Sequence, residues 1–235
     1  MLNPSDTPIF IICRDKLSCL LEQLDWLYQN NLNRIYLIDN QSTYPPLLDF
    51  FLKTHHRVIK LGANVGCGAP WSRNIVQTIS PNSFYVVTDP DVVPVSECPN
   101  DVISHFYDLL QKYPQYNKTG FSLKIDDIPE TYQFHKEVVK WESKFYQTEL
   151  ESGVFEANID TTFALYRPGS QREVGRKCIR TGFPYQARHL PWYMNSAELT
   201  EEEAYYREHS GASHNHGTWG KAELTDSFRA QIDKL

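Results

Sequence analysis

Two carboxylates separated by one residue, Asp89 and Asp91, follow directly after the apolar run 84–88 of this 235-residue chain. The run is rich in β-branched and aromatic residues, which predicts a covered strand, and Pro90 and Pro94 forbid its continuation as a central one. Ligands of open α/β sheets bind at the carboxyl ends of the strands, and hard oxygen ligands there suit Mg²⁺ or Mn²⁺. The pattern predicts a divalent-metal site. Because acid pairs also occur in many turns, the preceding strand is what supports this prediction.

The elements that must position these carboxylates alternate along the first half of the chain. Apolar runs and leucines at helical spacing predict strands over residues 8–13, 34–38, 57–61 and 84–88, and helices over 16–31, 47–53 and 71–79. Such alternation implies βαβ units with right-handed crossovers and a largely parallel sheet. The polar clusters that follow three of these strands are then expected along one sheet edge: Arg14-Asp15, Asp39-Asn40 and Asp89-Pro90-Asp91.

The second half of the chain is less regular. Its patterns predict helices over residues 99–112, 131–150 and 200–209, strands over 119–125 and 163–166, and a partly detached helix over 222–235. The three glutamates at 201–203 are interpreted as a solvated first helical turn. A chain of this length is expected to form a single domain, residues 1–235.

Composition limits the classes of function. The net charge of −6 argues against a general nucleic-acid binder, and 14 Tyr, 12 Phe and 5 Trp suit stacking on bases and sugar rings as well as filling a core. Five scattered cysteines without a Cys-x-x-Cys pair favour a reducing compartment. No segment has the length and apolarity of a signal peptide or transmembrane span, so we expect a cytoplasmic protein and leave peripheral attachment to a membrane surface open.

Three motifs follow one another along the first half of the chain: Asp39-Asn40 within segment 38–43, the Asn64-Val65-Gly66 loop, and Asp89-Pro90-Asp91. In this order and at these spacings they resemble the nucleotide-sugar glycosyltransferases of the GT-A fold, particularly the family-2-like bacterial enzymes with a DxD motif. The resemblance covers the first half of the chain. It implies a Rossmann-like α/β fold with a mixed, mainly parallel central sheet flanked by helices, a nucleotide-binding half of about 1–95, an irregular acceptor-side half of about 96–220, and a tail over 221–235.

The resemblance also implies roles for particular residues. Asp39 would accept a hydrogen bond from a uracil-type base, with Arg14 near the base or the diphosphate. Asn64 and Gly66 would border the nucleotide, Asp89 would contact the ribose and a metal-bound water, and Asp91 would bind the ion. Enzymes of this fold often take another contact from near the carboxyl terminus, where this chain has three candidates: His214, His216 and Trp219. A polar surface loop and a hydrophobic clasp are the structural alternatives for these residues.

The group that acts on the acceptor is harder to find. Inverting transfer needs a carboxylate base, and segment 188–193, where the resemblance places one, contains none. His189 in that segment is a candidate base or phosphate contact. Asp160 is the favoured acceptor-side carboxylate and Asp127 the second, although both also suit structural turns or caps. Retention and inversion of the anomeric configuration both stay open.

The leading hypothesis is a metal-dependent glycosyltransferase of the hexosyltransferase type. Its donor is expected to be a nucleoside-diphosphate sugar, in particular a UDP-sugar, and its acceptor a saccharide or glycolipid. A nucleotidyltransferase is disfavoured because segment 13–18 lacks the glycines that hold a triphosphate after the first strand. A non-catalytic carbohydrate-binding domain of the same fold is the third hypothesis.

Overall fold

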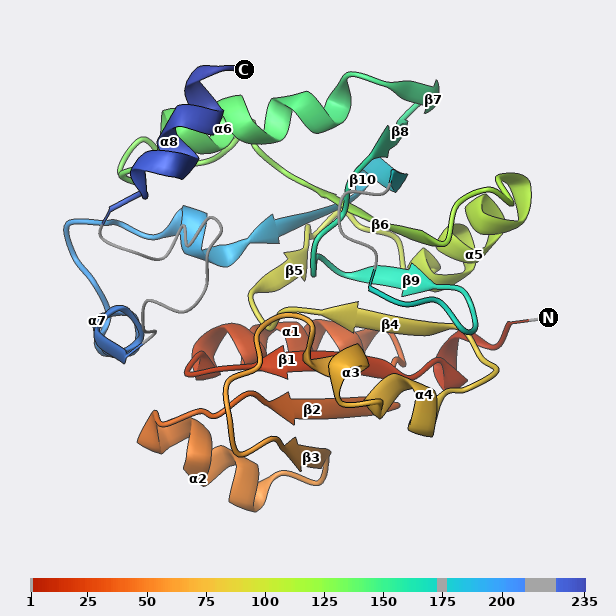
Figure 1. The fold of residues 1–235 in the computed structure, drawn as a ribbon, viewed down its shortest axis with the longest axis horizontal. Coiled ribbons are helices and arrows are strands. Elements are labelled where there is room, and N and C mark those ends of the chain that lie inside the picture. The colour runs from red at the N-terminus through yellow and green to blue at the C-terminus, as the bar shows by residue number, and fades with distance from the viewer. Residues whose placement is uncertain (1, 173–176, 210–222) are drawn as a thin grey trace.

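The structure is a computed structural model of the chain and describes residues 2–172, 177–209 and 223–235. The described residues form a mixed sheet in the order β3-β2-β1-β4-β9-β6-β10-β8-β7, with β5 paired to β10 (Figure 1). The strands are β1 (Ile9–Cys13), β2 (Ile35–Asp39), β3 (Arg57–Lys60), β4 (Tyr85–Thr88), β5 (Val92–Pro94), β6 (Lys118–Leu123), β7 (Glu149–Glu151), β8 (Val154–Ala157), β9 (Ala164–Tyr166) and β10 (Cys178–His189). The first four strands confirm the predicted βα alternation.

Helices cover both faces of the parallel half of the sheet. The helices are α1 (Leu17–Gln29), α2 (Pro45–Lys53), α3 (Ala69–Ser72), α4 (Ile75–Ile79), α5 (Val102–Lys112), α6 (His135–Ser143), α7 (Glu201–His209) and α8 (Asp226–Asp233), with short 3₁₀ turns at Pro4–Asp6, Lys144–Tyr146 and Leu190–Tyr193. Alternate residues of β1 serve two cores: Ile9 and Ile11 pack with α1 and α5, and Phe10 and Ile12 pack with α3 and α4. This alternation follows from the two-residue period of a strand that is covered on both sides.

The order of the parallel strands creates a switch point between β1 and β4. From β1 the chain adds β2 and then β3 on one side, and later places β4 on the other side of β1, with both neighbours parallel to it. After β1 the chain continues to β2 on one side of it, and after β4 it goes on to β6 on the other side, so the carboxyl ends of β1 and β4 mark the place where open α/β sheets bind ligands. These ends point to the left in Figure 1, toward α7.

The second half departs from the predicted elements. Strand β10 was not predicted; it pairs parallel to β6 and antiparallel to β8 and β5, with a register shift between Thr181 and Gln186. Strands β5, β7 and β8 were also missed. The predicted helix over 131–150 was too long, because α6 ends at Ser143 and β7 begins at Glu149. Short strands without clear alternation carry little signal, and their pairing partners decide their conformation.

Three further expectations were wrong in detail. The helix predicted over 71–79 is interrupted at Asn74, whose φ of 54° ends α3 and starts α4. The carboxyl-terminal helix α8 is not detached, because Phe228 packs its ring 4.7 Å from that of Trp141 on α6 and both Phe228 and Ile232 are buried. Glu203 is not solvated but buried, at 2% exposure. Among the described residues, no helix has the length and apolar character needed to cross a bilayer.

Candidate functional site

Asp89 occupies a tightly held turn at the end of β4. Its backbone N–H donates to the Thr161 carbonyl at 2.8 Å, and the Thr161 hydroxyl donates to its Oδ2. Gln23 on α1, fully buried, donates from Nε2 to the carbonyls of Asp89 at 2.9 Å and Val92 at 2.6 Å. The carboxylate is thus fixed from two sides by groups far away in the sequence. Neither Gln23 nor Thr161 was predicted, because no local pattern marks a buried amide that spans a turn.

Asp91 lies on the same turn and faces the last residue of β10. The N–H of Leu190 donates to the Asp91 carbonyl at 2.9 Å, and His189 Nε2 lies 3.7 Å from Asp91 Oδ2, too far for a direct hydrogen bond. Burial lowers the pKa of His189, which outweighs the opposite effect of Asp91. His189 is therefore a neutral imidazole beside a carboxylate. Within the described part of the chain, no hydrogen bond reaches the Asp91 carboxylate.

The charge of this turn fits a cation. Burial raises the pKa of Asp89, and the nearby charge of Asp91 raises it further, against the hydrogen bond from Thr161. Two carboxylates that destabilise each other's charge are relieved by a divalent ion between them. The residues present therefore fit a metal. In the described ranges, however, no group of three His, Cys, Asp or Glu side chains is arranged to hold an ion, so water and ligand oxygens would have to complete the shell.

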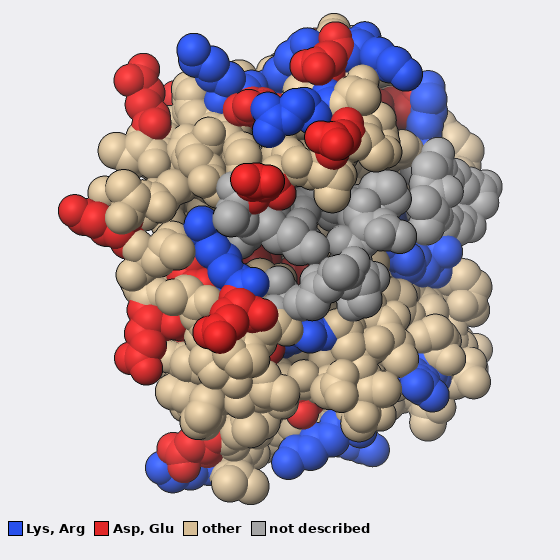
Figure 2. All heavy atoms as spheres, turned by 60° about the vertical axis from the view of Figure 1, so that its left-hand side comes forward, with Lys and Arg blue, Asp and Glu red and all other residues tan. Residues whose placement is uncertain are grey.

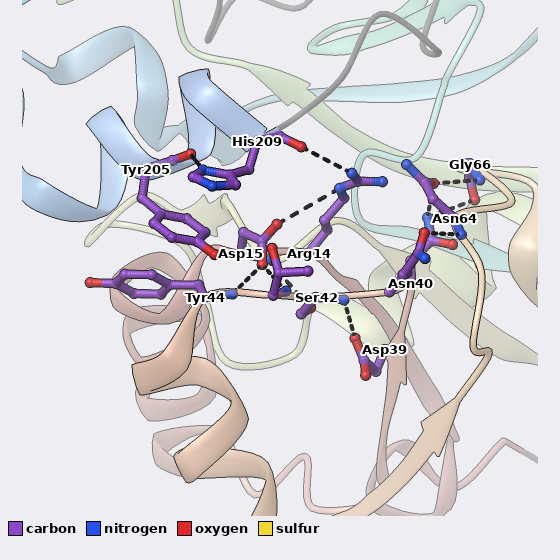
Figure 3. A network of polar contacts seen from close by, with 12 residues as sticks. Arg14, Asp15, Asp39, Asn40, Ser42, Tyr44, Asn64, Gly66, Tyr205 and His209 are labelled. Carbon is purple, nitrogen blue, oxygen red and sulfur yellow. Dashed lines mark hydrogen bonds and ion pairs between the residues drawn. The ribbon is translucent and has the colours of Figure 1, made fainter.

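The loops after β1 and β2 are joined by Asp15, which sequence reasoning placed in a polar cluster without a role. Asp15 is buried, has a φ of 50°, and accepts from the backbone N–H groups of Thr43 and Tyr44 at 2.6 and 2.8 Å (Figure 3). Asp39 is also buried at this edge, and its Oδ1 accepts from the Ser42 N–H at 2.7 Å. The same loop thus presents Asp39 beside the end of β2, where the nucleoside contact was predicted.

Arg14 lies on the neighbouring loop with part of its hydrogen-bonding capacity unused. Its Nη2 donates to the His209 carbonyl at 3.3 Å, and its Nε lies 3.9 Å from Asp15 Oδ2. Nε and Nη1 are buried, and neither has a hydrogen-bond partner among the residues that the structure describes. Buried guanidinium donors are rarely left unsatisfied, so an anionic ligand is the chemistry that this arrangement suits. Tyr205 stacks on His209 with ring centroids 3.9 Å apart and adds an aromatic wall beside this loop (Figure 3).

The predicted nucleotide-bordering loop is organised by Asn40. Its side chain accepts from the Val65 N–H at 2.9 Å and donates to Asn64 Oδ1 at 3.0 Å, and Asn64 Oδ1 also accepts from the Gly66 N–H (Figure 3). Gly66 has a φ of 75°, a conformation that glycine adopts without strain. The Asn64 side chain therefore shapes the loop. A nucleotide contact from this loop stays a prediction.

Asp160, the favoured acceptor-side carboxylate, lies near enough to Asp89 to act on its charge. It is exposed, at 72% of its side chain, and forms an ion pair at 3.4 Å with Arg172, which also donates to Cys67 Sγ at 2.9 Å. Its charge contributes to raising the pKa of Asp89. The structure thus brings Asp160 within electrostatic range of the Asp89 turn, with a carboxylate that solvent and ligands can reach.

Asp127, the second acceptor-side candidate, is engaged by its neighbours. Arg188 Nη2 contacts its Oδ2 at 2.5 Å, and the Tyr193 hydroxyl donates to its Oδ1 at 2.6 Å. Partial burial raises the pKa of Asp127, but these two hydrogen bonds and the charge of Arg188 lower it overall. A carboxylate with both oxygens occupied and a depressed pKa is a weak base, so its contacts favour a structural role.

Helix α7 closes this edge of the molecule. Lys16 Nζ lies 2.7 Å from Glu203 Oε2, with both side chains about 95% or more buried, and the ring of Tyr206 lies 4.4 Å from Lys16 Nζ. Glu202 accepts from the N–H groups of Leu17 and Ser18 and so caps α1. Sequence reasoning missed all of these contacts. The remaining predicted residues, His214, His216 and Trp219, lie outside the described residues.

Figure 2 shows this edge of the sheet turned toward the viewer, with acidic atoms inside a hollow in the middle of the face. The hollow is bordered by both basic and acidic side chains. The carboxyl ends of β1, β2 and β4 thus supply a polar site at the switch point, built from carboxylates, the Arg14 guanidinium and aromatic rings.

Comparison with known proteins supports the fold. No protein-family model matches the chain, and no curated protein matches its sequence. The crystal structure of UDP-glucose pyrophosphorylase complexed with UDP-glucose is similar with a TM-score of 0.51 and 12% identity, over 86% of this chain and 99% of the other. Glucosyl-3-phosphoglycerate synthase from Mycobacterium tuberculosis, in complex with phosphoglyceric acid, gives 0.40 and 11%, over 69% and 58%. The chain has a GT-A-type, Rossmann-like α/β fold, as predicted.

Proposed function

We propose that this chain is a metal-dependent glycosyltransferase that uses a nucleoside-diphosphate sugar, in particular a UDP-sugar, and transfers the sugar to a saccharide or glycolipid hydroxyl. The observation that carries the proposal is the Asp89 turn at the switch point of the sheet. There, the Asp91 carboxylate has no hydrogen-bond partner in the described part of the chain. The charged form of the Asp89 carboxyl group is disfavoured by burial and by the charge of Asp91, which raise its pKa. Such a pair suits Mn²⁺ or Mg²⁺ on a diphosphate.

Different residues around the turn would contact different parts of the sugar nucleotide. Asp39, buried at the end of β2, would accept from the base, and the free donors of Arg14 would contact phosphate oxygens. A divalent ion held by Asp89 and Asp91 would supply positive charge next to the leaving diphosphate. His189, neutral beside Asp91, would contact phosphate or substrate hydroxyls without adding charge.

The acceptor side needs a base. In the net transfer, the acceptor oxygen bonds to the anomeric carbon, the bond from that carbon to the phosphate oxygen breaks, and the nucleoside diphosphate leaves with the electron pair. The hydroxyl proton must go to a nearby group. Asp160 suits this role better than Asp127, because its carboxylate is exposed near Asp89, whereas both oxygens of Asp127 are occupied.

A nucleotidyltransferase is the main competing function, since the pyrophosphorylase shares the fold. In that chemistry a glycine-rich loop directly after the first strand usually holds the triphosphate through its backbone N–H groups and a basic side chain. The lysine at that position, Lys16, is buried and paired with Glu203 at 2.7 Å, and segment 13–18 contains no glycine. The observation favours a diphosphate ligand over a triphosphate.

Calorimetric titration with UDP in the presence and absence of Mn²⁺ tests the proposal. We expect Mn²⁺ to strengthen UDP binding and Asp91→Asn to abolish that gain, whereas the matched control Asp126→Asn, an exposed carboxylate paired with Lys124, leaves it intact. Thr161→Val removes the hydroxyl that fixes Asp89 and is expected to weaken Mn²⁺ binding about tenfold, as loss of a partner that orients a metal ligand does. A UDP affinity that is the same with and without Mn²⁺, and that Asp91→Asn does not change, contradicts the assignment of Asp89 and Asp91 to a metal.

Turnover separates the competing functions. Incubation with a panel of sugar nucleotides and Mn²⁺ should give slow release of nucleoside diphosphate with one of them, and this release should be lost in Asp91→Asn. Formation of pyrophosphate from UTP and a sugar 1-phosphate would instead establish a nucleotidyltransferase. Metal-dependent UDP binding without either reaction would favour the non-catalytic carbohydrate-binding domain.

A further inference from the structure

A second cluster of metal-ligating side chains lies at the opposite edge of the sheet. It consists of Tyr28 near the end of α1 and of His55 and His56, which directly precede β3. Because β3 runs parallel to β4, the amino end of β3 and the Asp89 turn lie at opposite ends of the parallel strands. The cluster is therefore separate from the candidate nucleotide site, and it does not depend on the function proposed above.

Three donor atoms converge within this cluster. The Tyr28 hydroxyl lies 3.3 Å from His55 Nε2, and it also contacts His56 Nε2. The two imidazole rings lie 4.4 Å apart, and the Tyr28 ring stacks on that of His56 with an interplanar angle of 12°. Both imidazoles thus direct the same nitrogen, Nε2, at one oxygen, although they belong to consecutive residues, whose side chains in a regular strand would point to opposite faces.

The spacing matches a borderline divalent ion. Zinc bonds to imidazole nitrogen at about 2.0–2.1 Å, which gives neighbouring ligands of a tetrahedral site a separation of roughly 3.3–3.4 Å. The Tyr28 hydroxyl and His55 Nε2 already show this separation, whereas the closer contact of the hydroxyl with His56 Nε2 must lengthen. Imidazole nitrogens suit Zn²⁺, Cu²⁺ and Ni²⁺ rather than Mg²⁺. Water can reach the remaining positions, because His55 and Tyr28 are exposed while His56 is buried.

We propose that Tyr28, His55 and His56 form a binding site for Zn²⁺ or a similar borderline divalent ion, with two imidazole nitrogens as ligands and the Tyr28 hydroxyl as the third donor or as the partner of a bound water. Such an ion would link the carboxyl end of α1 to the start of the edge strand β3.

The full-length protein without a histidine tag allows a direct test by calorimetric titration with Zn²⁺. The wild type is expected to bind one equivalent more than the double variant His55→Asn/His56→Asn, and Tyr28→Phe is expected to bind that equivalent about tenfold more weakly. Two controls keep the sites apart. His135→Asn, on α6, should leave the stoichiometry unchanged, and Asp91→Asn should retain the equivalent that the double variant loses.

The expected pattern supports the proposal, and a double variant that binds as much Zn²⁺ as the wild type overturns it. If His56→Asn unfolds the chain, as judged by its circular dichroism, the exposed His55→Asn and Tyr28→Phe variants carry the test alone, because each still removes one of the three donors. Loss of the equivalent in Asp91→Asn instead would assign the ion to the candidate nucleotide site and overturn the proposal.

Discussion

The buried ion pair between Lys16 and Glu203 allows a quantitative test of how the two ends of the chain are held together. The two charged atoms lie 2.7 Å apart, and the side chains are only 5% and 3% exposed. Burial by itself lowers the pKa of Lys16, but the charge of Glu203, with a smaller contribution from Asp91, raises it above its usual value. Lysine therefore stays charged, and its contribution to stability is fully present at neutral pH and is lost only as the pH rises through this raised pKa.

Glu203→Gln leaves that charge without its main partner. Breaking a buried pair in this way costs about 3–5 kcal/mol of unfolding free energy. The free energy of deprotonating the lysine sets an upper limit on this loss. With a reference pKa of about 10.4, deprotonation costs about 4.6 kcal/mol at pH 7. Because Asp91 still favours the charged form, we expect a loss near the lower end, about 3 kcal/mol.

Urea unfolding followed by circular dichroism measures this loss. The control is Asp49→Asn, which removes an equally short pair with Lys53 at 2.6 Å whose side chains are 58% and 72% exposed, and which should change stability by less than about 0.5 kcal/mol. The apolar double variant Lys16→Met/Glu203→Leu should recover most of the loss. The penalty of Glu203→Gln should also shrink as the pH rises toward 10. Equal effects of Glu203→Gln and Asp49→Asn would refute the reasoning.

Two further predictions concern packing and the pKa of a lysine. Gly120→Ala places a Cβ 2.6 Å from the Phe163 carbonyl oxygen, so urea unfolding should show a loss of about 3 kcal/mol or more, whereas Gly62→Ala, in open space with a φ of 70°, should cost about 1 kcal/mol through backbone strain alone. Lys144 Nζ lies over the Trp141 ring, and burial lowers the pKa of Lys144 to about 8. At pH 8 about half of the Lys144 side chains are therefore unprotonated, compared with roughly 0.4% for an ordinary lysine. Limited acylation with peptide mapping should therefore label Lys144 first; a midpoint near pH 10 in its rate profile would contradict this.

The elements that sequence reasoning found are those whose signal is local. The runs 8–13 and 84–88 are continuous and apolar, and both became buried strands because any strand placed inside a sheet covered on both faces needs such residues. Strand β10 gave no such signal. It contains Gly182 and Pro184, its register shifts at the same point, and its pairing with β6, β8 and β5 is what makes it a strand.

The candidate site shows the same division. The positions of Asp39 and Asp89 at strand ends followed from the alternation of elements, because parallel strands share a carboxyl edge. Their supports did not follow. Asp89 is 72 positions from Thr161 and 66 positions from Gln23 in the sequence, and Lys16 is 187 positions from Glu203. The run of three glutamates at 201–203 predicts a solvent-exposed helical turn, whereas the tertiary fold buries Glu203, the one that pairs with Lys16.

The contacts of α7 make the candidate nucleotide site depend on the end of the chain. Glu202 caps the first turn of α1, Glu203 neutralises Lys16, and the His209 carbonyl accepts from Arg14, so three successive features of the loop after β1 are held by one helix. Loss of α7 would leave the α1 amino end uncapped and a buried cation unpaired, and both costs fall on the loop that carries Arg14. A nucleotide held by that loop is therefore expected to stabilise α7 against local unfolding, which hydrogen exchange of the α7 amides with and without UDP and Mn²⁺ would measure. Equal α7 exchange under both conditions, at saturating UDP, would separate the helix from the site.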